Sequence, residues 1–225
     1  MSTPFLLQRE EVSVSTQFTE PAFRLFEGAS SAAFMEGFWR RLNPLGLSLN
    51  DLQGDSEGYQ LGRTILSASL DSYGVQIRIR FGGVELWANL RQVGFDRAAL
   101  VYSLALEAIR DVSTSPPFAT YMFTYHTHGK LEAGGVSEFV ARLGQSPPAG
   151  LGPHVGSGVS FYFGPEEDRL VSGVNLDLSA VVVGGLYFRV DVTLDGSKID
   201  YSASAARARE YIRAASEKFG LVPTK

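Results

Sequence analysis

Residues 75–90 read VQIRIRFGGVELWANL, and this stretch predicts a β-hairpin. Apolar and polar residues alternate on both sides of Gly82-Gly83, which is the period of a strand with one buried face. The glycine pair is typical of a tight turn between two such strands. We therefore expect the apolar positions to face a core and the polar positions to face water. The polar positions are Gln76, Arg78, Arg80, Glu85, Trp87 and Asn89.

The segments around the hairpin predict one strand and two helices. Glu11 to Phe18 alternates like a strand, and Ser31 to Leu42 has the apolar spacing of an amphipathic helix. After the hairpin, a helix is expected from Asp96, as its N-cap, to Val112. The segment STSPPF, residues 113–118, then interrupts the pattern.

The same order of elements returns after this interruption. It begins with a strand and a helix, continues with three strands and ends with a long helix. Gly220 is placed to end that helix as its C-cap. The expected ranges are Ala119–His128, Val136–Leu143, Gly158–Phe163, Leu170–Leu178, Leu186–Leu194 and Tyr201–Phe219.

Short runs of letters also match between the two halves, 1–112 and 119–225, at offsets of 101 to 103 residues. FWRRL at Phe38 precedes FVARL at Phe139, and GYQLG at Gly58 precedes SFYFG at Ser160. GGVEL at Gly82 likewise precedes GGLYF at Gly184, and Ala108-Ile-Arg110 precedes Tyr211-Ile-Arg213. These matches suggest an internally duplicated β-α-β-β-β-α unit, whereas chance similarity between common hairpins and helices is the alternative.

The expected fold is α+β, with both repeats in one compact domain. Joined side by side, they would form one long, curved antiparallel sheet of about eight strands with four helices on its apolar face. This order of elements resembles the saddle of the TATA-binding-protein fold and, more loosely, the helix-grip folds. The resemblance is one of arrangement, so it implies no function.

Composition excludes several classes of function. The net charge of −4 argues against a nucleic-acid partner, because phosphate backbones attract proteins with an excess of Lys and Arg. The absence of cysteine excludes thiolate nucleophiles and disulfides. Neither a secretory signal nor a run long enough for a membrane span is expected, so a bacterial-type cytoplasm is the predicted location.

His126 and His128 are the most conspicuous candidates for a metal site. The string HTHGKLE, from His126 to Glu132, resembles the core of the first cupin motif, and His154 after Pro148-Ala-Gly150 resembles part of the second. That resemblance implies manganese, iron or zinc held by the two histidines, Glu132 and His154. It covers only about 30 residues and departs from the motif at positions where a cupin has glycine. No metal or other cofactor is therefore predicted, and the histidines are expected on the wet face of a strand.

The polar face of the predicted sheet is the better candidate for binding. It combines arginine, tryptophan and tyrosine, which protein interfaces enrich, although such pairs also stabilise neighbouring strands. The predicted partner-binding residues are Arg78, Arg80, Trp87, Tyr187 and Arg189.

No phosphate loop, dinucleotide fingerprint or other convergent catalytic set occurs, so an enzyme is not the leading hypothesis. The leading hypothesis is a non-enzymatic binding protein, such as an immunity protein, chaperone or adaptor, that docks a protein partner or a second copy of itself. The alternative is a small apolar ligand held between sheet and helices, where the alanine-rich residues 203–215 would leave room. A metal-dependent enzyme built on His126, His128 and Glu132 is the third hypothesis.

Overall fold

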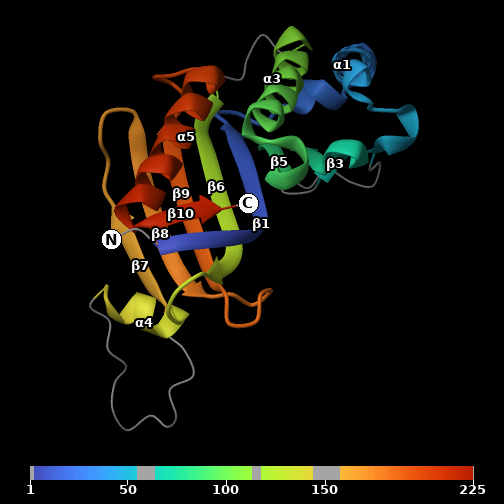
Figure 1. Cartoon of the computed structure of the whole chain (residues 1–225). Helices are drawn as coiled ribbons and strands as arrows, with labels where there is room; N and C mark the ends of the chain where they lie inside the picture. The colour runs from blue at the N-terminus through green and yellow to red at the C-terminus, as the bar shows by residue number, and fades with distance from the viewer. Residues whose placement is uncertain (1–2, 55–63, 113–117, 144–157, 225) are drawn as a thin grey trace, which may run out of the picture.

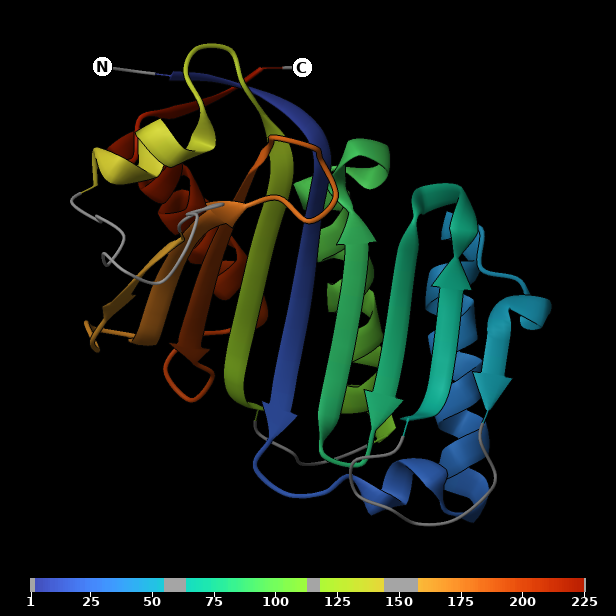
Figure 2. The same ribbon diagram turned by 90° about the horizontal axis from the view of Figure 1, so that it is seen from below.

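The computed structural model of the protein describes residues 3–54, 64–112, 118–143 and 158–224. These residues form an α+β fold with one long sheet of ten strands and five α-helices (Figures 1 and 2). The strands are β1 Thr3–Phe18, β2 Leu52–Gly54, β3 Thr64–Leu70, β4 Val75–Arg80, β5 Gly83–Asn89, β6 Phe118–Leu131, β7 Val159–Phe163, β8 Arg169–Leu178, β9 Leu186–Asp195 and β10 Leu221–Thr224. The helices are α1 Gly28–Leu42, α2 Leu90–Val93, α3 Phe95–Val112, α4 Val136–Ala141 and α5 Tyr201–Lys218.

The strands follow the order β2-β3-β4-β5-β1-β6-β9-β8-β7, and every neighbouring pair is antiparallel. The long strands β1 and β6 lie at the centre and pair from Phe5 opposite Leu131 to Phe18 opposite Phe118. Read outward from this centre, β1 is followed by β5, β4 and β3, and β6 by β9, β8 and β7. On each side, the first long strand of the half lies at the centre and pairs with the last strand of the meander that follows it in sequence, and the other two strands of the meander lie outside.

The expectation of about eight strands was too low. β2 and β10 are the additional strands, with three and four residues, and such short segments carry no readable alternation. β10 pairs in parallel with the start of β1, at the opposite end of the chain. The matching segment Gly58–Gly62 lies outside the described residues.

The predicted hairpin is confirmed as β4 and β5, with Arg78 opposite Glu85. Glycine is needed at position 83 because a side chain would collide with β1, and not because the backbone has an unusual φ angle. A Cβ atom on Gly83 would lie 2.2 Å from the carbonyl oxygen of Thr16 in β1, whereas one on Gly82 would meet nothing within 4 Å. Close packing of β5 against β1 thus excludes a side chain at this position.

The long helices begin and end for identifiable reasons. Asp200 caps α5 by accepting a hydrogen bond from the Ala203 amide at 2.8 Å. Gly220, which was predicted as the C-cap, follows the C-cap residue Phe219 and has a φ of +70°. Asp96 was expected to cap α3 but lies in its first turn, because the helix begins at Phe95. Its carboxylate instead forms an ion pair with Arg209 of α5.

Helices α1, α3 and α5 lie on one face of the sheet, and α4 packs near the end of the second half (Figures 1 and 2). The buried core lies between these helices and the strands. Its centre is aromatic: the Tyr201 ring lies 5.0 Å from Tyr102 and 5.7 Å from Tyr121, and it stacks on Phe123 at 6.1 Å. All four side chains are buried, so they join α3 and α5 to the central strands.

Candidate functional site: an open sheet face and a helix groove

The open face is the side of the sheet away from α1, α3 and α5, and Figure 2 shows it in front of them. Alternate residues of each strand point to it, as the alternating burial of β4, β5 and β9 shows. Each of the five predicted partner-binding residues lies at a position of this face. Arg78 and Arg189 are exposed, whereas Arg80, Trp87 and Tyr187 are partly buried.

In the first half, Trp87 lies opposite Gln76 of β4 and Ser13 of β1. Arg80 forms an ion pair with Glu85 at 2.9 Å, and Arg78 donates to Gln76 at 3.1 Å. The flat indole surface is thus only partly open to solvent, between short polar neighbours. Exposed Arg78 is the more accessible charged group of this cluster.

In the second half, Arg189 is held by Asp191, with its Nε 2.9 Å from one carboxylate oxygen. Thr124 donates to the same carboxylate at 2.7 Å. β5 and β9 are separated by β1 and β6, so Trp87 and Arg189 are about three strand spacings apart, or about 14 Å. The structure therefore places the predicted residues on one face but divides them into two clusters.

A carboxylate that the sequence did not single out lies between these clusters. Glu11 of β1 is only 3% exposed, although it is on the face that the helices leave uncovered. Arg9 donates to it at 2.5 Å, and Nε2 of His126 lies 2.5 Å away. Burial raises the pKa of Glu11, but the hydrogen bonds and charges of Arg9 and His126 outweigh burial and hold that pKa below its usual range.

His128 lies beside this network under the loop between β8 and β9. Its Nδ1 is 2.8 Å from the Ser179 hydroxyl, and its ring lies 4.9 Å from that of Tyr187. Burial lowers the pKa of His128, and the positive charges of His126 and Arg9 lower it further. The neutral imidazole is therefore favoured at this position.

The two histidines share a face, as predicted, and their ring centroids are 6.3 Å apart. The expectation that both face water is wrong for His128, which is buried beneath the loop between β8 and β9, and His126 is only partly exposed. His126 is already bonded to Glu11, and exposed Glu132 follows the end of β6, where its amide donates to Pro4. Among the described residues, no three His, Asp or Glu side chains are grouped so that they could hold a metal ion. His154 lies outside these residues, so the cupin-like set is not assembled by the part of the chain that the structure describes.

A second candidate site lies on the helix side of the sheet, where α3 and α5 flank the central strands. This groove has a volume of about 1230 Å³. Its walls include Leu100 of α3 and Val222 of β10, whose exposed fractions are 49% and 47%, and the small residues Ala205 and Ala206 of α5. The small side chains of residues 203–215 were expected to leave room between this helix and the sheet, whereas the groove lies between α5 and α3, above the central strands.

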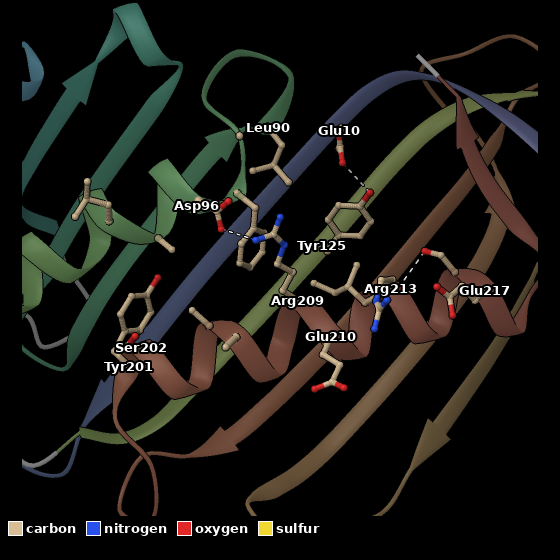
Figure 3. A pocket seen from close by; sticks show the side chains of 18 of the residues that line it. Glu10, Leu90, Asp96, Tyr125, Tyr201, Ser202, Arg209, Glu210, Arg213 and Glu217 are labelled. Carbon is tan, nitrogen blue, oxygen red and sulfur yellow. Dashed lines mark hydrogen bonds and ion pairs between the residues drawn. The ribbon is translucent and has the colours of Figure 1, made fainter.

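Polar groups stand at the floor and the mouth of the groove (Figure 3). At the floor, the Tyr125 hydroxyl of β6 donates to Glu10 of β1 at 3.0 Å. At the mouth, Arg209 reaches from α5 to Asp96 of α3. Burial, together with the negative charge of Glu10, raises the pKa of Tyr125, so its hydroxyl stays protonated as a donor.

No helix among residues 3–54, 64–112, 118–143 and 158–224 has the length and apolar character needed to cross a membrane. No protein-family model matches the chain, and the search of curated proteins finds no similar sequence. Function is therefore inferred from the geometry of the open face and of the groove.

Proposed function

We propose that this is a non-enzymatic binding protein that docks a protein partner, or a second copy of itself, on the open face. The observation that supports this proposal is the one-sided arrangement of the long helices α1, α3 and α5, which leaves the open face to solvent (Figure 2). A bacterial-type cytoplasm and an immunity, chaperone or adaptor role are compatible with such a surface.

The side chains of the open face have the character of an interface. Apolar surface is exposed at Met122 of β6, Tyr162 of β7 and Val171 of β8, with exposed fractions of 43%, 81% and 46%. Arg189 of β9 lies among these side chains, between β6 and β8, whereas Arg78 adds a charge on β4 in the first half of the sheet. Exposed aromatic and apolar side chains beside arginine are the composition that interface centres enrich. The ion-paired Glu11 would add a fixed, preorganised polar group at the middle.

The test is the double variant Trp87→Ala, Arg78→Ala. We expect it to weaken self-association or partner capture by about 30-fold or more, because truncated hot-spot residues typically cost at least 2 kcal/mol. Oligomeric mass is measured by light scattering, and partners are captured by cross-linking in cells. The matched control is Arg40→Ala on exposed α1. If the double variant keeps both its mass and its captured partners, the open face is not the docking surface.

We further propose that the fold arose by internal duplication of a β-α-β-β-β-α unit, in an arrangement similar to the TATA-binding-protein saddle. The support is the matching strand order on the two sides of the β1–β6 pair, together with the matching letters at nearly constant offset. In this scheme β1 corresponds to β6, and β5 to β9. The histidines of β6 then have no histidine counterpart in β1, so any role they have is confined to one half.

The groove supports a second candidate function, the binding of a small apolar ligand. Its volume exceeds the roughly 300 Å³ that a ligand site needs, and Leu100 and Val222 leave apolar surface unfilled. The test is binding of the neutral apolar dye Nile red. Ala206→Trp should block the groove, whereas Ala203→Trp, on the same helix but outside the groove lining, should not. Equal dye binding by both variants would remove this candidate.

A further inference from the structure

The charges around the groove between α3 and α5 are unbalanced. Four carboxylates line it, from Glu10, Asp96, Glu210 and Glu217, against the two guanidinium groups of Arg209 and Arg213. The formal charge of the lining is therefore −2. A groove with apolar walls and a negative lining attracts cations more strongly than anions.

Glu10 is the carboxylate best placed to select a ligand. Glu10 and Glu11 are consecutive in β1, so their side chains point to opposite faces of the sheet. Glu11 is on the open face, and Glu10 is on the floor of the groove (Figure 3). Its only side-chain hydrogen bond to another described residue comes from Tyr125, whose hydroxyl donates to Oε1. A carboxylate accepts several hydrogen bonds, so Oε2 of Glu10 can still accept hydrogen bonds from a ligand.

Glu11 and Asp96 are compensated in a way that Glu10 is not, whereas Glu210 and Glu217 form no ion pair with another described residue but are exposed to water. Arg9 pairs with Glu11, and Arg209 pairs with Asp96. Among the described residues, no Lys, Arg or His forms an ion pair with Glu10, which is only partly exposed. Removing a carboxylate from water is costly without a compensating charge, and a bound cation would supply that charge.

We propose that the groove binds an amphipathic cation, an amine on an apolar body, with its ammonium group on Glu10. The inference rests on the groove being a ligand site, the second candidate above. The apolar body lies against Leu100, Ala206 and Val222, and the ammonium group donates to the carboxylate that Tyr125 orients. The hydrogen bond from Tyr125 fixes the carboxylate before the ligand arrives, which reduces the entropy lost on binding.

The experiment compares three probes that differ only in their head group: decylammonium, decanol and decanoate. Each is used below the concentration at which it forms micelles, and binding is read as displacement of Nile red. We expect decylammonium to bind about 10-fold more tightly than decanol, as for a hydrogen bond to a charged group, and decanoate to bind most weakly. Added salt should reduce the advantage of the amine.

Glu10→Gln should remove the preference for decylammonium and leave the affinity for decanol unchanged. Glu20→Gln, which changes an exposed carboxylate two residues past the C-terminal end of β1, is the matched control and should keep the preference. The comparison of probes on the unmodified protein remains decisive if Glu10→Gln fails to fold.

The possible failures are distinguishable. If decanol binds in the groove but decylammonium binds no more tightly, the amine assignment is wrong and the groove survives as an apolar ligand site. Tighter binding of decanoate would also overturn the assignment. If none of the probes displaces the dye, or Ala206→Trp leaves their binding unchanged, the groove itself is not a ligand site.

Discussion

At the scale of single residues, two buried tyrosines in the core differ in their hydrogen bonds. The Tyr102 hydroxyl donates to the Val84 carbonyl at 2.8 Å and lies 2.7 Å from Oγ1 of Thr16, whereas the Tyr201 hydroxyl has no partner within the described structure. We expect Tyr102→Phe to lower the free energy of unfolding by about 1–3 kcal/mol, because it leaves buried polar groups unsatisfied. Tyr201→Phe should be neutral or stabilising. Urea titration measures both, and equal losses would contradict this account.

A second prediction for a single residue is that the stability of the protein depends on pH through His128. Its pKa is lowered in the folded state, so the unfolded chain binds a proton below about pH 6.5 that the folded chain does not. Stability should therefore fall as the pH falls from 7.5 to 5.5, by at most about 1.4 kcal/mol per pH unit for one proton. His128→Asn keeps a polar group near Ser179 but cannot titrate. Its urea midpoint should fall less over this range, and parallel profiles would show that another group is responsible.

At the scale of elements, the hairpin β4–β5 gives a prediction with its own control. Gly83→Ala places a Cβ atom 2.2 Å from the Thr16 carbonyl oxygen, so β5 must move away from β1. We expect a loss of about 1–3 kcal/mol in the free energy of unfolding, as for other overpacked sites. Gly82→Ala meets open space and has no positive φ, so it should be neutral or slightly stabilising. Similar losses for the two variants would mean that the turn, and not the strand contact, requires glycine.

Elements with a clear period were predictable from sequence, and elements without one were not. Alternation placed Tyr121 and Phe123 in the core and His126 on the opposite face, as the structure confirms. The start of β1 could not be read, because TPFLLQREE does not alternate and the strand is irregular between Leu7 and Arg9. The Glu11–His126 contact depends on the register of two strands that are over 100 residues apart in sequence. The groove likewise depends on the spacing of α3 and α5, which no local pattern encodes.

At the scale of the whole molecule, the two candidate sites share the central strands. Glu10 faces the groove and Glu11 faces the open face, and β6 supplies a partner to each, Tyr125 and His126. A ligand in the groove and a partner on the open face would therefore contact opposite sides of the same strand pair. This arrangement gives a direct physical route for coupling, which would have to be reciprocal between the two sites.

The same strand pair predicts that the two halves unfold as one unit. Both tryptophans, Trp39 and Trp87, are in the first half, so their fluorescence reports that half, whereas circular dichroism reports the whole chain. We expect the two signals to give the same urea midpoint, because one continuous hydrophobic core spans both halves. Leu186→Ala, a fully buried change in the second half, should cost about 2–5 kcal/mol and shift both midpoints equally. If the tryptophan midpoint stays in place while the dichroism changes, the halves are independent domains, and the β1–β6 pairing does not couple them.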